Sequence, residues 1–522
     1  MKKTLYPWQE DCLTHWFSNH GRGMVQAATG TGKTLLALTA ADRLNRALND
    51  QLLVKIVVPT GALMRQWHRA LRDSLLKSGT ETREAADIQR KIGLRGGSFR
   101  MPADRKYMIY VINSARYELA RQILSDLKSG APVLLIADEC HRYESGQNRL
   151  IFEFLPYIKD YGQRFFSLGL SATLPSGPAM GYLSSVLGKK IYSYSMAQAA
   201  SLQQISQYDV FHIGLSFSRS EQEAYEEISD RMKLLYANLL HKYPYLKDLN
   251  RKECFEHLRA LSGNPDQKTA EAAASYMKLS FKRKSLICLA SARVLCAHDL
   301  VLRLPAHDKI LIFGERIDQA EELYLLLQKS FPGKVGRYHS RMGQQANHNA
   351  LCRFRDGETR ILIACKAIDE GLDVPDASVG IILSGTSMQR QRVQRLGRIL
   401  RLNKGKDRAA LYYLHVTKSA EDCVFLPDAK TGRILELEYE ANEREFIHPA
   451  YDRAVAALLP DLLAEETDPK RLAEIQRCLH VGRVRADWLL DRGELARKLQ
   501  NATDTGERNY WFCMKKIAGP HP

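Results

Sequence analysis

The chain has 522 residues, of which 76 are lysine or arginine and 59 are aspartate or glutamate, so its formal net charge is +17 at pH 7. This length predicts two or three domains, the 45% of hydrophobic residues suffices for soluble cores, and the basic excess favours a polyanionic partner without identifying it. The ten cysteines contain no Cys-x-x-Cys pair, and neither an apolar leader nor a run of ~18 apolar residues is evident, so we expect no zinc site, disulfide framework or membrane span, and a cytoplasmic protein.

The first chemical signal lies near the N-terminus, between an apolar strand at 24–26 and a helix expected over 35–44. The intervening sequence runs Ala27-Ala28-Thr29-Gly30-Thr31-Gly32-Lys33-Thr34, with alanine at position 27 where the strict phosphate-binding loop has glycine. The two glycines let backbone N–H groups converge on a phosphate at a helix N-terminus. Lys33 would bridge the β- and γ-phosphates and Thr34 would hold Mg²⁺, so the loop predicts a nucleoside triphosphate site.

The second signal follows the unbroken apolar run 133–137, which is typical of a buried parallel strand. Asp138 and Glu139 come directly after it, at the sheet edge where α/β proteins place ligands. Asp138 would orient Mg²⁺, and Glu139 would position and deprotonate the attacking water. The pair predicts that the bound nucleotide is hydrolysed.

Arginines are dense in the segment 391–401. Arg398 and Arg401 lie three residues apart and therefore share one face of a helix. An arginine that approaches the γ-phosphate from a second domain stabilises transition-state charge, an effect of roughly 10³–10⁵ in rate. The alternative is a basic helix that faces nucleic acid, and Arg395 fits that role.

Nine segments, in this order, resemble superfamily 2 helicases and translocases of the DExH type, in particular the XPB-like and restriction-subunit-like group. The segments are 5–9, 27–34, 58–67, 111–114, 138–141, 170–173, 310–316, 361–375 and 391–401. The resemblance implies an α/β fold with two RecA-like parallel-sheet lobes, a helical insertion and a mainly helical C-terminal extension. It also implies ATP and Mg²⁺ as cofactors and nucleic acid as the track, with DNA preferred and RNA left open.

The same resemblance assigns roles to individual residues. Those implied to bind ATP are Gln9, which would read adenine, and Thr29, Gly30, Thr31, Gly32, Lys33, Thr34, Gly371 and Asp373. Those implied to couple the ATP state to strand grip are His141, Ser171 and Thr173, and Gln394 joins Lys33, Asp138, Glu139, Arg398 and Arg401 in catalysis. Those implied to contact the nucleic-acid backbone are Pro59, Thr60, Gln66, Ser114 and Arg395.

The motifs predict a division into a first ATP-binding lobe at 1–213, a helical insertion at 214–303, a second lobe at 304–440 and a helical extension at 441–522. In the insertion we expect a helix capped by Ser220 and a break near 263–265. Its role is left open between gripping duplex, acting as a spacer and docking a partner. The basic, glycine-containing stretch 90–106 is expected to be a flexible loop, and the aromatic residues at 509–512 to be core.

The sequence thus predicts an ATP-dependent DNA helicase or translocase whose ATPase is stimulated by nucleic acid. The alternatives are an ATP-gated duplex clamp or remodeller that does not unwind, and an RNA helicase. Repair, restriction and antiviral defence all use such motors, often beside a separately encoded nuclease or within a complex.

Overall fold

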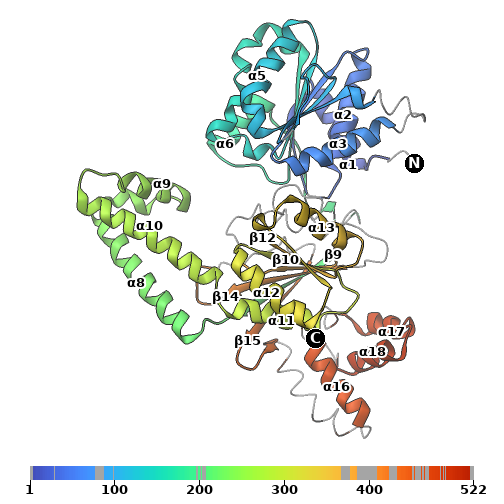
Figure 1. Cartoon of the computed structure of the whole chain (residues 1–522), viewed down its shortest axis with the longest axis vertical. Helices are drawn as coiled ribbons and strands as arrows, with labels where there is room; N and C mark the ends of the chain where they lie inside the picture. The colour runs from blue at the N-terminus through green and yellow to red at the C-terminus, as the bar shows by residue number, and fades with distance from the viewer. Residues whose placement is uncertain are drawn as a thin grey trace.

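The computed structural model describes two lobes, each built on a parallel sheet covered by helices (Figure 1), which confirms the predicted α/β class. The residues described are 4–28, 30–76, 88–97, 99–195, 198–199, 202, 207–365, 377–384, 408–421, 432–449, 452, 460, 464, 469–482, 484–485, 487 and 490–517.

The first lobe contains an eight-stranded sheet in the order β4-β3-β5-β2-β6-β7-β1-β8, with every pair parallel except β3–β4. Its strands are β1 (Arg22–Ala27), β2 (Leu53–Val58), β3 (Ile92–Gly96), β4 (Phe99–Arg100), β5 (Tyr107–Val111), β6 (Val133–Asp138), β7 (Phe165–Ser171) and β8 (Lys190–Tyr194). Helices α1 (Pro7–Ser18), α2 (Lys33–Ala47) and α3 (Gly61–Leu76) cover one face, and α5 (Ile112–Lys128) and α6 (Pro178–Leu187) cover the other. The central strands are apolar on both faces because both faces are covered.

The second lobe also contains an eight-stranded sheet, in the order β11-β12-β10-β13-β14-β9-β15-β16, and only β16 runs antiparallel. Its strands are β9 (Gln207–Leu215), β10 (Ile310–Gly314), β11 (Val335–Tyr338), β12 (Ile361–Cys365), β13 (Val379–Ile382), β14 (Arg408–Val416), β15 (Gly432–Glu440) and β16 (Glu445–Ile447). The helices of this lobe are α11 (Ala292–Arg303), α12 (Ile317–Ser330) and α13 (Gln344–Arg355).

Three predicted domain boundaries differ from this arrangement. Strand β9 lies between β14 and β15, so the boundary at 213 falls inside a strand of the second sheet. Helix α11 packs into the core of the second lobe rather than into the insertion, and the sheet continues past 440 to Ile447. The chain therefore gives one strand to the second sheet before the insertion begins, a long-range pairing that no local pattern specifies.

The insertion forms a helical arm, defined here as 219–288, that projects from the second lobe (Figure 1). It consists of α8 (Arg219–Lys242), α9 (Arg251–Leu261) and α10 (Gln267–Cys288), so the break expected near 263–265 is confirmed. The distal part has its own small core around Leu239, Leu258 and Ala273. The predicted cap at Ser220 is wrong, because Ser218 caps α8 and forms a capping box with Glu221.

The C-terminal extension contains α16 (Pro469–Gly482), α17 (Arg492–Gln500) and α18 (Thr505–Ile517). Tyr510 and Trp511 lie in the core that these helices share, as predicted, whereas Phe512 is 38% exposed. Short 3₁₀ helices occupy Cys140–Arg142, Gly146–Phe152, Leu155–Tyr157, Lys159–Arg164, Pro244–Lys247 and Ser340–Met342.

The prediction of a flexible loop at 90–106 is wrong, because β3 and β4 form part of the first sheet there. The prediction relied in part on Gly93 and Gly96, and both pack closely against the neighbouring strand β5. A Cβ at Gly93 would lie 2.2 Å from the Met108 sulfur, and one at Gly96 would lie 2.6 Å from Val111 Cβ. Gly93 permits close approach within β3, whereas Gly96 also has a φ of +135° where β3 ends and pairs with Phe99 of the antiparallel β4.

One helical run among the described residues, 267–303, is long and apolar enough to cross a membrane, which differs from the sequence expectation. Its most apolar window has a mean hydropathy of 1.6, and 61% of that window is buried inside the protein. The run comprises α10 and α11, and α11 packs into the core of the second lobe. Buried core helices of globular proteins meet the same criteria.

Candidate functional site

The predicted site residues of the first lobe follow the carboxyl ends of five strands. The phosphate-binding loop follows β1, the predicted track residues Pro59 and Thr60 follow β2, Ser114 follows β5, Asp138 ends β6, and Ser171 ends β7. Because these strands are parallel, their carboxyl ends meet at one edge of the sheet. The fold therefore brings the ends of β1 at Ala27 and β7 at Ser171, 144 residues apart in sequence, to one surface.

The phosphate-binding loop is held in its shape by two left-handed glycines and one buried amide. Gly30 and Gly32 have φ angles of +86° and +91°, and Gly32 is the N-cap of α2. The Gln9 amide donates to the Gly32 carbonyl oxygen at 3.1 Å and accepts from the Tyr6 backbone N–H at 2.9 Å. A Cβ at Gly32 would lie 2.7 Å from Gln9 Nε2, so glycine is required both for backbone conformation and for this contact.

Lys33 begins helix α2 with its ammonium turned back onto the loop. Its Nζ donates to the carbonyl oxygens of Ala27 and Ala28, at 2.9 and 3.5 Å. Thr34 follows in the first turn of α2, and the Thr31 hydroxyl closes the loop through a 2.7 Å hydrogen bond to Ala28. This donor set fits a triphosphate, because the loop backbone, the helix N-terminus and the Lys33 ammonium all favour anionic oxygens.

Asp138 is buried at the end of β6, and both of its carboxylate oxygens accept hydrogen bonds. Trp67 Nε1 donates to Oδ2 at 2.8 Å, and the Glu139 backbone N–H donates to Oδ1 at 3.0 Å. Burial, followed by the Glu139 carboxylate, raises the pKa of Asp138 to about 6, against the opposing effects of the Trp67 hydrogen bond and the Lys33 charge. The loop follows β1 and the acidic pair lies at the end of β6. These two strands flank β7 as parallel strands, so the loop and the acidic pair lie at the same edge of the sheet.

A short series of polar contacts leads from the acidic pair to the strand end at β7. Glu139 has a left-handed φ of +51°, and its Oε2 lies 3.4 Å from His141 Nδ1. His141 Nδ1 lies 2.9 Å from Ser171 Oγ, and that hydroxyl donates to the Thr173 carbonyl oxygen at 2.6 Å. Because the Ser171 hydrogen is used in that bond, His141 Nδ1 carries the hydrogen that it donates to Ser171. The predicted coupling residues therefore form a continuous path with Glu139.

The predicted track residues Pro59, Thr60, Gln66 and Ser114 are partly exposed near the same edge. Thr60 caps α3, since its Oγ1 accepts from the Leu63 N–H at 3.3 Å. The remaining predicted residues lie outside the described ones: Thr29, Gly371, Asp373, Gln394, Arg395, Arg398 and Arg401.

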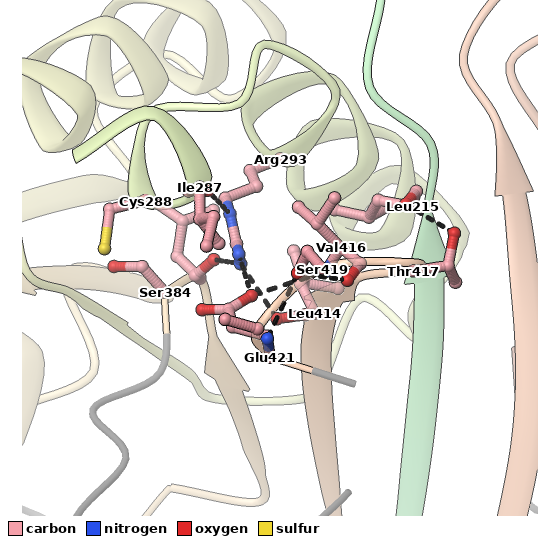
Figure 2. A network of polar contacts seen from close by, with 12 residues as sticks. Leu215, Ile287, Cys288, Arg293, Ser384, Leu414, Val416, Thr417, Ser419 and Glu421 are labelled. Atoms are coloured by element: carbon pink, nitrogen blue, oxygen red, sulfur yellow. Dashed lines mark hydrogen bonds and ion pairs between the residues drawn. The ribbon is translucent and has the colours of Figure 1, made fainter. Parts of the chain in front are cut away.

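A buried arginine of the second lobe was missed by the sequence analysis. Arg293 has no exposed surface and lies in the first turn of α11, where a helix dipole disfavours a cation. Its guanidinium donates to the carbonyl oxygens of Ile287, Leu383 and Leu414 at 2.9, 2.6 and 2.8 Å, and forms an ion pair with Glu421 (Figure 2). A lone charge within the apolar run 292–297 was the signal that could have revealed it.

Through these contacts Arg293 joins the second sheet to the root of the helical arm, by which we mean the start of α8 and the end of α10. We call this set of contacts the buried joint. Ile287 belongs to the last turn of α10 and Leu414 belongs to β14 (Figure 2). Leu383 follows β13. Two further bonds bind the arm root to the same lobe: Ala420 N–H donates to the Tyr225 hydroxyl at 3.0 Å, and Ser291 N–H donates to Glu221 at 2.9 Å.

We expect Arg293→Met to lower the free energy of unfolding by about 3–5 kcal/mol, because Glu421 and three carbonyl oxygens would lose their buried partner. The control is Arg353→Met, which removes an exposed ion pair with Glu358 at 3.0 Å and should cost at most about 1 kcal/mol. Chemical denaturation followed by circular dichroism measures both. Equal losses in the two variants would contradict a buried joint.

The comparisons with known proteins agree with this geometry. Residues 2–176 match the family described as type III restriction enzyme, res subunit, and residues 292–403 match the helicase conserved C-terminal domain. The chain is 27% identical over 424 residues to the DNA 3'-5' translocase XPB2 of Sulfurisphaera tokodaii, which covers 81% of this chain and 83% of that protein.

Two more similarities extend over most of the chain. One relative is the DNA 3'-5' helicase XPB of Kineococcus radiotolerans, at 23% identity over 80% of this chain and 60% of that protein. A solved fragment described as an HsdR subunit of a type I restriction enzyme from Vibrio vulnificus superposes with a TM-score of 0.52, at 18% identity, over 84% of this chain and 69% of that one. The latter likeness shows a shared two-lobe fold.

Proposed function

We infer that this chain is a superfamily 2 helicase or translocase of the XPB-like and restriction-subunit-like group, and we propose that it couples ATP hydrolysis to movement on DNA or to its unwinding. The observation that carries the proposal is the continuous path from Glu139 through His141 to Ser171. The path begins at Glu139, the carboxylate proposed to activate water, and ends at Ser171, the last residue of β7. This strand end lies at the sheet edge where the predicted track residues also lie. An ATPase without a track has no use for that connection.

In the proposed mechanism the first lobe binds ATP and activates water. Lys33, which now donates to loop carbonyl oxygens, would hold the β- and γ-phosphates, and Gln9 beside the loop would read the adenine edge. Thr34 and Asp138 would hold Mg²⁺, which would supply positive charge to the phosphate oxygens. Glu139 orients the attacking water and takes its proton.

The second lobe would complete the site when the lobes close on the track. We assign Arg398 and Arg401 to transition-state stabilisation with Gln394, and Gly371 and Asp373 to the nucleotide. Arg395 would hold the nucleic-acid backbone together with the predicted track residues of the first lobe. The DExH segment, residues 138–141, would couple ATP hydrolysis to nucleic-acid binding through His141. We propose that β9 and the region 292–449 form one lobe, separate from the arm and the C-terminal extension.

DNA is the proposed track because the two relatives above, which match 80% or more of the chain, are named for action on DNA. A relative named as an RNA helicase, DBP8 of Scheffersomyces stipitis, matches 20% of the chain.

A duplex clamp that does not unwind is the second candidate function. The proposed partners are a separately encoded nuclease or other complex subunits. We place the protein in the cytoplasm.

We expect the basal ATPase rate to be slow and to rise when nucleic acid is added, because a polyanion held by both lobes would keep them closed. Stimulation should weaken with salt, and log affinity should fall with log salt by about 0.9 per duplex phosphate contacted, or about 0.7 per single-strand phosphate. Steady-state ATPase assays with duplex DNA, single-stranded DNA and RNA of equal length measure this, and DNA should stimulate most.

ATPase activity that is indifferent to all three polymers at low salt would overturn the motor proposal. Strand displacement from labelled duplexes, run beside triplex displacement, separates unwinding from translocation. Activity in the triplex assay alone identifies a translocase, and activity in neither, with stimulation intact, favours the clamp.

A further inference from the structure

Helix α3 connects Thr60, a predicted track residue, to Asp138, the carboxylate proposed to hold the metal. It begins at Gly61, immediately after Thr60, whose hydroxyl caps it. Two turns further along, Trp67 reaches Asp138 with its indole N–H at 2.8 Å. At 1.5 Å of rise per residue, the two positions are only about 10 Å apart along one helix.

The same helix also faces the second lobe. Tyr338, which is 9% exposed, ends β11 of the second lobe. Trp67 and Tyr338 belong to one buried apolar cluster that spans both lobes. A shift of α3 relative to the first sheet would therefore change the hydrogen bond between Trp67 and Asp138, and a shift of the second lobe would change the packing around α3.

The Trp67 contact is suited to positioning rather than to packing alone. The side chain is 1% exposed, and its N–H donates to one carboxylate oxygen while the Glu139 backbone N–H donates to the other. The second donor belongs to the segment that carries Asp138 itself, so among the described residues Trp67 is the hydrogen-bond donor that ties this carboxylate to another element. Hydrogen bonds to ligating carboxylates fix their orientation, and their loss typically costs 10–100-fold in metal affinity or activity.

We propose that Trp67 is a positioning residue that orients Asp138 for the metal-bound nucleotide and makes this orientation depend on nucleic acid bound at the N-terminus of α3. The proposal rests on the proposed function for the identity of the track. It differs from the role that family resemblance gives this segment, which is contact with nucleic acid, because Trp67 is buried and points to the ATP site.

The test replaces Trp67 by phenylalanine, and separately by 3-benzothienylalanine, an analogue with the shape of tryptophan but no N–H. Trp16 is the matched control: it is also 1% exposed, and its Nε1 donates to the Ser167 carbonyl oxygen at 3.0 Å within the same lobe. The same two replacements at position 16 remove a buried indole hydrogen bond that does not reach Asp138. Thermal unfolding of all four variants measures the stability that each site loses.

We expect both replacements at position 67 to raise the Mg²⁺ concentration needed for half-maximal binding of a fluorescent ADP, measured by anisotropy, by about 10-fold. The ratio of DNA-stimulated to basal ATP turnover should fall towards one in the same variants. The position 16 variants should keep the wild-type Mg²⁺ dependence and ratio.

Equal Mg²⁺ dependence and equal stimulation ratios at positions 67 and 16 would show that Trp67 only packs, and would overturn this inference with the motor function intact. A changed Mg²⁺ dependence with an unchanged ratio would overturn the link to the track. If the wild-type ATPase does not respond to nucleic acid at all, the proposed function fails first, and the Mg²⁺ titration alone still decides whether Trp67 orients Asp138.

Discussion

Replacement of Arg398 by alanine should lower the nucleic-acid-stimulated ATP turnover rate by roughly 10³-fold or more, while ATP affinity changes far less. An arginine finger acts on charge that develops only in the transition state, so its loss appears in kcat rather than in ground-state binding. Arg401→Ala should behave in the same direction. Single-turnover hydrolysis, with nucleotide affinity measured separately, distinguishes the two quantities.

Arg353→Ala provides the control, because this arginine of α13 is exposed and, among the described residues, its side chain pairs with Glu358. It should leave turnover unchanged. If Arg398→Ala instead weakens nucleic-acid binding and retains normal turnover at saturating DNA, Arg398 belongs on the nucleic-acid face beside Arg395, and the finger role falls to Arg401.

The second large effect is expected at Glu139. Glu139→Gln should slow hydrolysis by about 10²–10⁴-fold and leave ATP bound, because the amide keeps the shape of the side chain but cannot accept a proton. The backbone N–H of residue 139 would still donate to Asp138, so the remainder of the acidic pair stays in place. Lys33→Ala should differ by losing productive ATP binding itself, since it removes a phosphate contact.

Nucleotide affinity and turnover measured on the same preparations decide between these outcomes. Glu153→Gln is the control, because Glu153 is an exposed carboxylate of the same lobe outside the site. Turnover at the wild-type rate in Glu139→Gln would remove Glu139 from the mechanism. Loss of ATP binding in that variant would instead give it a structural role.

The parts of the site that could be predicted are those that depend on short, contiguous stretches of sequence. The loop around Gly32 requires left-handed glycines at a helix start, and Asp138 ends a strand whose other residues form an unbroken apolar run. Strand direction then determines that both lie at the same edge, so their proximity follows from the fold class alone.

The parts that could not be predicted depend on contacts between distant residues. Trp67 and Asp138 are 71 residues apart, and Arg293 bonds to carbonyl oxygens 90 and 121 residues away. β9 joins a sheet whose other strands come later in the chain, and its pairing is set by the whole second core. Local propensity carries no information about such partners. At Gly93 it favours a loop, whereas close packing against Met108 explains why glycine stands within strand β3.

The helical arm has a distal core of its own and a root bound to the second lobe through Arg293 and Tyr225. These two regions tolerate different kinds of change. Because the tip between the far end of α8 and the start of α10 packs on its own core, we expect its exchange as a unit to leave the second sheet undisturbed. The root cannot be exchanged in this way, and a chimaera must inherit Arg293 and Glu421 together. Diversification of this protein should therefore be concentrated at the tip of the arm, where new binding surfaces arise without cost to the ATPase.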